Sequence, residues 1–282
     1  MAQAVALAQQ YQAVAAVAAL TILLSWETIR PFFDFVRPRR GRAVHVVRNL
    51  GLGALNSVVV TVVFVGLWII AAEWAVAKNF GLMNAVATSS PVLHAVGAIL
   101  LLDAWTYVWH RLNHRIPFLW RFHRVHHADP QMDVSTGGRF HVGEIVLSSV
   151  LRIPLIILLG VYAWELVLYE TAMFTVVQFH HANVSLPARL DCALRAVIVT
   201  PAMHKVHHSR LRPETDSNYS ALLSVWDRIG RSFRLRDDPH TIEFGLDEFG
   251  DDDERFGKLM TMPTRSVTRR KKDEPPKRDQ PS

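Results

Sequence analysis

The sequence predicts an all-α fold, an integral membrane bundle of about four to five spanning helices whose last two form a hairpin. Half of the 282 residues are hydrophobic and the mean hydropathy is +0.15, which favours membrane integration. Several apolar runs reach the roughly 20 residues that cross a bilayer. The single cysteine, Cys192, excludes an intrachain disulfide framework and a CxxC zinc site.

The first three apolar runs each predict one span. They cover residues 11–26, 50–76 and 92–109, and the third leads directly into a histidine-rich segment. Few charged residues interrupt them, so each run can lie in hydrocarbon.

The fourth apolar run, 145–179, is too long for one span. We expect it to fold as a helical hairpin that turns near Gly160. The chain then divides into N-terminal spans and loops at 1–90, a histidine-bearing domain at 91–245 and a tail at 246–282. The tail is polar and basic, and we expect it to be disordered.

Lysine and arginine are concentrated in the loop 37–48, in the segment 110–144 and after His180. By the positive-inside rule these segments face the cytoplasm, whereas the N-terminus and the loop 77–91 face outward. The net charge of +6 therefore reflects membrane topology, and we expect no nucleic-acid partner. The expected location is a bacterial inner membrane, or the endoplasmic reticulum membrane if the source is eukaryotic.

Eight of the fourteen histidines fall into three short boxes, one HxxxH and two HxxHH. A spacing of three or four residues places the histidines of a box on one helix face. All three boxes are expected on the cytoplasmic side of the membrane, where they would form a helical cap. The eight residues are His110, His114, His123, His126, His127, His204, His207 and His208.

Imidazole is a strong ligand for first-row transition metals. Eight imidazoles exceed the four ligands of one tetrahedral zinc ion and suit two metal ions with open positions. Thr200 and Pro201 before the third box predict an N-cap and the first residue of a helix. His141 and the pair His180-His181 are further possible ligands. An alternative is that His180 is an interfacial residue and only His181 faces the site.

Asp103 is an ionisable residue within an apolar run, which marks it as a candidate for the functional site. It shares a helix face with Tyr107, which is a further candidate to support a ligand, and with His110, but two helical turns, about 10 Å, separate Asp103 from His110. We therefore expect Asp103 to support a histidine from another element by a hydrogen bond. The alternative is a structural ion pair with Arg152, which also lies in an apolar run.

Two further polar residues lie beside possible ligands. Glu144 follows His141 closely, and Asn183 follows His181. Either can support a metal ligand through a hydrogen bond. For Glu144 the alternative is an interfacial ion pair with Arg139.

Beyond the boxes, the sequence resembles the fatty acid hydroxylase superfamily in HANV at 181–184, in Asn218-Tyr219 and in Trp226-Asp227-Arg228. The resemblance covers roughly residues 103–233. It implies a membrane enzyme whose non-haem di-iron centre uses O2 and two electrons to hydroxylate or desaturate an unactivated C–H bond of a lipid. One departure is Ile229-Gly230-Arg231-Ser232, where the family often has Leu-Phe-Gly-Thr.

The same resemblance implies that the eight box histidines bind two iron ions, with His181 as a further ligand and His141 as a weaker one. No fused haem-binding domain is visible, so we expect electrons from a separate protein similar to cytochrome b5 or a ferredoxin. The lipid stays open among fatty acyl chains, sterols and related molecules.

Three other classes of protein are alternatives to the oxygenase. A histidine-rich metal transporter would place ligands at mid-membrane depth on several spans, whereas the boxes lie at one face. A zinc-dependent membrane hydrolase would need a general-base carboxylate in a motif such as HExxH, which no box contains. A metal-binding scaffold without catalysis would keep the histidines but show no activity.

Overall fold

The computed structural model describes residues 2–35, 39–86 and 90–266. Within these ranges every regular element is a helix, and two isolated β-bridges are the remaining regular pairings. The predicted all-α fold is confirmed. The terminal residues 267–282 of the expected tail lie outside the described part of the chain.

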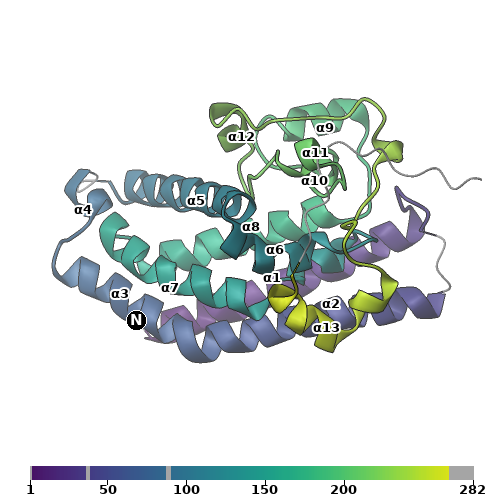
Figure 1. Cartoon of the computed structure of the whole chain (residues 1–282). Helices are drawn as coiled ribbons and strands as arrows, with labels where there is room; N and C mark the ends of the chain where they lie inside the picture. The colour runs from purple at the N-terminus through teal and green to yellow at the C-terminus, as the bar shows by residue number, and fades with distance from the viewer. Residues whose placement is uncertain (1, 36–38, 87–89, 267–282) are drawn as a thin grey trace, which may run out of the picture.

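The long helices run side by side as a bundle (Figure 1). Helix α1 (Ala2–Ile29) packs along α8 (Ala163–His181), and α3 (Val65–Ala77) packs on α7 (Val142–Leu159). Helix α5 (Pro91–Arg115) contacts both α7 and α8. A common apolar core that includes Phe64, Trp68, Leu102, Ile156 and Tyr169 holds α3, α5, α7 and α8 together.

Four described segments are long and apolar enough to cross a membrane. Their outward faces expose large apolar side chains, as hydrocarbon contact requires. The segments are Gln10–Ile29, Gly41–Val86, Pro91–Arg115 and Val142–Leu159.

The predicted hairpin is present, and Gly160 is its turning point. Gly160 ends α7 with a φ of 73°, and its N–H donates to the carbonyls of Ile156 and Ile157. A Cβ at this position would lie 2.7 Å from the Phe80 carbonyl oxygen and 2.6 Å from the side-chain nitrogen of Asn84. Both the left-handed backbone and the close approach therefore require glycine.

A second rod of helix runs through the lower part of the molecule in Figure 1. It consists of α2 (Arg39–Val59), the π-helix η1 (Val60–Phe64) and α3, which follow one another without a break. Helix α4 (Leu82–Val86) connects this rod to α5 at the end of the bundle where the N-terminus lies.

Shorter helices gather at the opposite end of the bundle from α4 (Figure 1). They pack against the ends of α5 and α8, where the histidine boxes lie. These helices are α6 (Pro117–His127), η2 (Val134–Gly138), α9 (Ala188–Leu194), α10 (Pro201–His207), α11 (Arg212–Thr215), α12 (Val225–Ile229) and η3 (Pro239–Thr241).

The expectation of a disordered tail from residue 246 is wrong for residues 246–266. This segment forms η4 (Asp251–Glu254), α13 (Phe256–Thr261) and η5 (Met262–Thr264). Its buried Leu259 and Met262 pack with Leu52 and Val125. The physical reason is that a few apolar residues spaced between charges suffice to dock the segment on α2 and α6.

Replacement of Gly160 by alanine should destabilise the protein by about 1–2 kcal/mol, because alanine in a left-handed conformation is strained. The clash with Phe80 adds to this cost. Thermal unfolding in detergent would measure the effect. Gly66→Ala is the matched control, since a Cβ there meets nothing within 4 Å and the site is helical. Equal melting temperatures for the two variants would contradict this account of the hairpin.

Candidate metal centre

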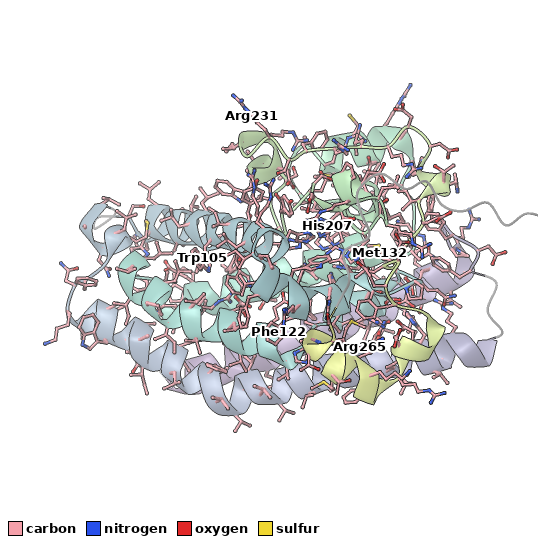
Figure 2. All side chains as sticks on the ribbon, viewed as in Figure 1. Trp105, Phe122, Met132, His207, Arg231 and Arg265 are labelled. Atoms are coloured by element: carbon pink, nitrogen blue, oxygen red, sulfur yellow. The ribbon has the colours of Figure 1, made fainter. Side chains whose placement is uncertain are left out.

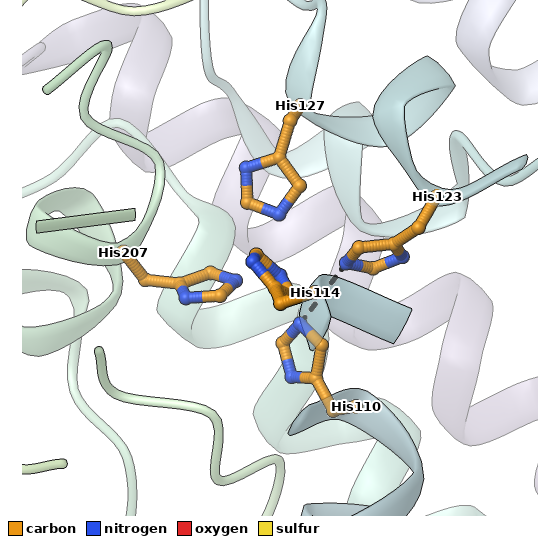
Figure 3. Close-up of side chains that lie close together, drawn as sticks. All are labelled: His110, His114, His123, His127 and His207. Atoms are coloured by element: carbon orange, nitrogen blue, oxygen red, sulfur yellow. Dashed lines mark hydrogen bonds between the residues drawn. The ribbon is translucent and has the colours of Figure 1, made fainter. Parts of the chain in front are cut away.

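The structure brings the three boxes together where the shorter helices meet the bundle, around His207 in Figure 2. One set, the five-histidine group, takes two residues from α5, two from α6 and one from α10 (Figure 3). Its ligand nitrogens all lie within 4.8 Å of one another. The group consists of His110, His114, His123, His127 and His207.

A second set, the four-histidine group, lies beside the first. It consists of His126, His181, His204 and His208, whose ligand nitrogens also lie within 4.8 Å of one another. All four residues are buried. The imidazole rings of His127 and His208, one from each group, stack with centroids 4.5 Å apart.

The two HxxHH boxes divide their histidines between the groups in a regular way. In α6, His123 and His127 join the five-histidine group and His126 joins the other. In the third box, His204 and His208 join the four-histidine group and His207 joins the other. In each box, the two histidines spaced by four residues lie one above the other on the helix and therefore belong to the same group. The remaining histidine points into the other group.

Several imidazoles have their protonation fixed by hydrogen bonds from Nδ1. A backbone carbonyl or a carboxylate oxygen accepts each of these bonds, so Nδ1 carries the proton in the neutral ring. The lone pair of Nε2 is then free to point into the group. The bonds join His110 to the Tyr219 carbonyl (2.7 Å), His207 to the Ser217 carbonyl (2.6 Å), His181 to the Val177 carbonyl (2.7 Å) and His123 to Glu144 Oε1 (2.9 Å).

The nitrogen positions fit metal ions. Nε2 of His110 lies 3.1 Å from Nε2 of His123, the contact dashed in Figure 3, although both rings carry their proton on Nδ1. Two lone pairs at this distance repel each other unless a cation lies between them. Two nitrogens about 2.1 Å from one metal ion, at right angles, would be about 3.0 Å apart.

The four-histidine group shows the same spacing. Nε2 of His181 lies 3.1 Å from Nε2 of His126 and 3.0 Å from Nε2 of His204. Other buried Nε2 atoms have no hydrogen-bond partner in the described structure, which is costly unless a ligand satisfies them. These belong to His114, His127, His207 and His208.

Burial keeps the imidazoles neutral. It is the main reason that the pKa of His207 falls to about 3; the hydrogen bond to the Ser217 carbonyl opposes this fall, and His123 and His181 add to it. Burial and then the adjacent histidine His181 lower the pKa of His126, and burial and then His208 lower that of His127. The neutral imidazole is the form that binds a metal ion.

Two possible ligands lie outside both groups. The ring of His180 stacks on that of His204 with centroids 3.9 Å apart, and its Nδ1 has no partner among the described residues. His141 instead caps α7: its Nδ1 accepts the Gly143 N–H at 2.9 Å, and its Nε2 donates to the Met260 carbonyl at 3.0 Å. Both nitrogens of His141 are therefore engaged in the structure.

The expectation that Asp103 bonds a histidine is wrong. Its carboxylate accepts the indole N–H of Trp226 at 2.7 Å and the backbone N–H of Leu223 at 3.0 Å. The alternative ion pair is also wrong, because Arg152 pairs with Glu170. Asp103 therefore connects α5 to the loop before α12 and to the start of α12. These residues are 120 or more positions apart, so helix periodicity could not predict the contacts.

The other supporting candidates differ in what they contact. Glu144 bonds His123, and Arg139, its alternative partner, pairs with Glu254 instead. The Tyr107 hydroxyl contacts the Ser232 hydroxyl at 2.9 Å.

Asn183 does not bond a histidine either. Its side chain binds both the backbone N–H and the carbonyl of Phe33, each at 2.9 Å. It therefore fixes the chain that follows α1. The N-cap prediction for α10 is confirmed in position, with Pro201 as the first helical residue, but the Thr200 side chain makes no capping bond.

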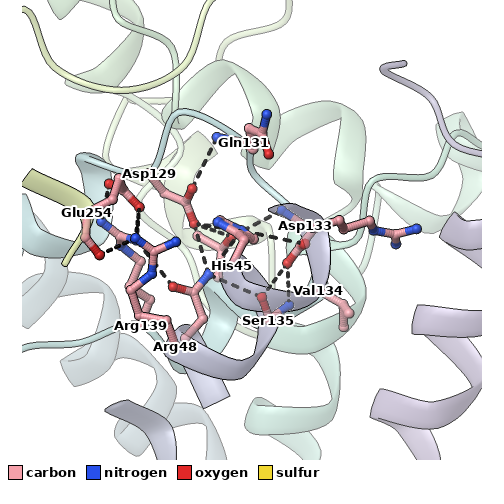
Figure 4. Close-up of polar contacts among 12 residues, drawn as sticks. His45, Arg48, Asp129, Gln131, Asp133, Val134, Ser135, Arg139 and Glu254 are labelled. Carbon is pink, nitrogen blue, oxygen red and sulfur yellow. Dashed lines mark hydrogen bonds and ion pairs between the residues drawn. The ribbon is translucent and has the colours of Figure 1, made fainter. Parts of the chain in front are cut away.

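A buried polar network beside the first HxxHH box was not predicted from the sequence (Figure 4). Asn49 donates to Asp129 at 3.1 Å, and His45 lies 3.6 Å from the same carboxylate. Arg139 pairs with Glu254 through two contacts of 2.8 Å and donates to the Val125 carbonyl at 2.9 Å. Through Val125, the network holds the helix that carries His123, His126 and His127.

Comparison with known proteins agrees with this geometry. The family model described as fatty acid hydroxylase matches residues 95–232, which contain all three boxes and His181. The chain belongs to the fatty acid hydroxylase superfamily. The hydroxylase domain thus runs from α5 to the segment just after α12.

Several characterised relatives share this domain. The ornithine lipid hydroxylase OlsE of Rhizobium tropici is 30% identical over 52% of this chain and 44% of its own length. Human alkylglycerol monooxygenase is 32% identical over 53% of this chain and 32% of its own length. Human cholesterol 25-hydroxylase is 24% identical over 52% of this chain and 53% of its own length. The chain therefore spans about half or less of these relatives, and no solved structure matches it.

Replacement of Glu144 by glutamine should weaken metal binding by about 10–100-fold, because the carboxylate orients His123 and raises its basicity. Competition with a chelator would measure the affinity. Glu165→Gln is the matched control: Glu165 is a buried carboxylate that contacts His94 at 2.7 Å, and His94 belongs to neither group. An equal loss of affinity in both variants would show that Glu144 acts only through general stability.

Proposed function

We propose that this chain is a membrane-bound di-iron oxygenase that hydroxylates or desaturates an unactivated C–H bond of a lipid. The observation that carries the proposal is the pair of adjacent, buried histidine groups, whose Nε2 atoms converge at about 3 Å. Under this proposal the five-histidine group holds one iron ion and the four-histidine group holds the other.

Bound iron would supply the activation of O2 that amino-acid side chains lack. The chain's own residues provide the setting for that chemistry. Backbone carbonyls and Glu144 orient the imidazoles, and burial lowers the pKa of His207 and keeps that ring neutral. The surrounding helices exclude water, since eight of the nine grouped histidines are buried and His110 is half-buried.

Family membership supports a lipid substrate. The names of the relatives describe action on an ornithine lipid, an alkylglycerol and cholesterol. The groups lie at one end of helices that are apolar enough to span a membrane, which is consistent with a substrate that resides in the bilayer. A fatty acyl chain, a sterol or a related lipid is the proposed substrate class.

Electrons would come from a separate protein similar to cytochrome b5 or a ferredoxin. The distribution of lysine and arginine supports a cytoplasmic orientation of the boxes. A bacterial inner membrane, or the endoplasmic reticulum membrane in a eukaryote, is the proposed location.

The position of the groups favours an oxygenase over a metal transporter. The five-histidine group draws on the end of α5 and the four-histidine group on the end of α8, and both share α6 and the third box, at one end of the bundle. A transporter would need ligands along the middle of several spans. Glu144 bonds Nδ1 of the grouped histidine His123 and so supports a ligand, and Asp216 lies 3.6 Å from Nδ1 of His114.

Lipid mass spectrometry of cells with and without the chain would test the proposal. We expect one lipid class to gain 16 mass units on hydroxylation or to lose 2 on desaturation. His207→Ala should abolish the product, whereas His240→Ala, a change of an exposed histidine outside both groups, should leave it intact.

Metal analysis of the same anaerobically purified proteins should give close to two ions per wild-type chain. No lipid change between the two cell lines would contradict the oxygenase proposal. A single tightly bound ion would contradict the dinuclear centre.

A further inference from the structure

The two histidine groups receive different support at their ring nitrogens. In the five-histidine group, Nδ1 of three rings bonds to Tyr219, Glu144 and Ser217, which belong to other elements. In the four-histidine group, Nδ1 of His181 bonds within its own helix α8, and Nδ1 of the other three rings has no partner in the described part of the chain. The backbone that carries these rings must therefore set their positions.

Glu27, near the end of α1, is buried and accepts three hydrogen bonds. Its Oε2 accepts the backbone N–H of Asn183 at 2.9 Å and that of Val134 at 3.0 Å, and its Oε1 accepts a bond from Arg42 at 3.0 Å. Glu27 is 1% exposed although it lies in a candidate membrane span. A buried ionisable residue in such a place marks a functional role.

The two backbone segments that Glu27 joins both adjoin His181. Asn183 comes two residues after His181, directly beyond α8. Val134 begins η2, and a Cβ on Gly137 of the same helix would lie 3.5 Å from Nδ1 of His181. One carboxylate therefore holds the end of α8 and η2 together around a ring of the four-histidine group.

Lys205 provides a second link to the end of α8. It lies on α10 beside His204, is 2% exposed, and donates to the carbonyls of Val184 at 2.7 Å and of Ala182 at 3.3 Å. A cation at the C-terminal end of a helix also interacts favourably with the helix dipole. Lys205 thus connects α10 to α8, and across this contact Nε2 of His204 lies 3.0 Å from Nε2 of His181.

Part of this support comes from outside the hydroxylase domain. Helix α1 precedes residue 95, where the family match begins, and packs along α8. Just after α1, the N–H of Phe32 donates to the Asn183 carbonyl at 2.9 Å, and the Phe32 ring lies 5.0 Å from the Lys205 ammonium. The α1 segment thus contacts both α8 and α10, the helices that carry His181 and His204.

We propose that Glu27 and Lys205 are positioning residues for the metal ion of the four-histidine group, so that α1 forms part of the metal centre. The inference rests on the proposed dinuclear centre. Both side chains act through the backbone: Glu27 holds the end of α8 against η2, and Lys205 holds it against α10. The five-histidine group takes its support from Glu144 and from loop carbonyls, so loss of Glu27 should leave that group intact.

Titration of the metal-free, full-length protein with Co2+ in detergent, in anaerobic competition with a fluorescent chelator, would test this assignment. His208→Ala identifies the binding step of the four-histidine group, and His114→Ala identifies that of the five-histidine group. Glu27→Gln keeps the size of the side chain but replaces one accepting oxygen by an amide nitrogen that cannot accept a bond. Glu165→Gln, a change of another buried carboxylate whose histidine partner belongs to neither group, is the matched control.

We expect Glu27→Gln and Lys205→Met each to weaken the step that His208→Ala identifies, by about 10–100-fold. The step that His114→Ala identifies should stay unchanged, as should both steps in Glu165→Gln. Equal weakening of both steps by Glu27→Gln would show a general effect on stability and overturn the proposal, as would two unchanged steps.

Binding of fewer than two Co2+ ions by the wild-type chain would contradict the dinuclear centre itself, and this proposal with it. Two ions in the wild type and no selective loss in the variants would overturn the positioning role alone. Neither readout depends on oxygenase activity.

Discussion

The arrangement of the whole cap depends on converging imidazole lone pairs. Nine histidines from α5, α6, α8, α10 and the residue after α10 direct ring nitrogens into two adjacent groups. Neutral lone pairs about 3 Å apart repel, and burial prevents water from relieving that repulsion. The fold therefore holds these rings together against the repulsion between their lone pairs, and bound cations would replace that repulsion by attraction. The extensive hydrogen bonds around the rings keep them in place.

Much of that support comes from one loop between α11 and α12. The carbonyls of Ser217 and Tyr219 accept hydrogen bonds from Nδ1 of His207 and of His110. Asn218 between them has a φ of 49°, and its side chain donates to the Met203 carbonyl at 2.8 Å. Asp227 in turn accepts the Tyr219 N–H at 2.7 Å. The Asn-Tyr and Trp-Asp-Arg motifs thus serve to position the carbonyls that orient metal-facing histidines.

Elsewhere in the chain, some features could be predicted from the sequence and others could not. The hairpin at Gly160 was predictable because an apolar run too long for one span must turn, and glycine permits the turn. The partners of Asp103 and the docking of residues 246–266 were not, because both depend on contacts between distant segments. Glu144 was found as a candidate from its place near His141, although its partner is His123.

The sequence by itself determined the all-α class, the apolar spans and which residues gather as histidine boxes, because periodicity and spacing are local properties of a chain. Only the tertiary structure decided how the nine histidines divide into two groups, that His141 caps a helix, and that α2 turns its polar face inward. These outcomes depend on which surfaces pack together. Packing is fixed by shape and by hydrogen-bond satisfaction between segments that are far apart in sequence.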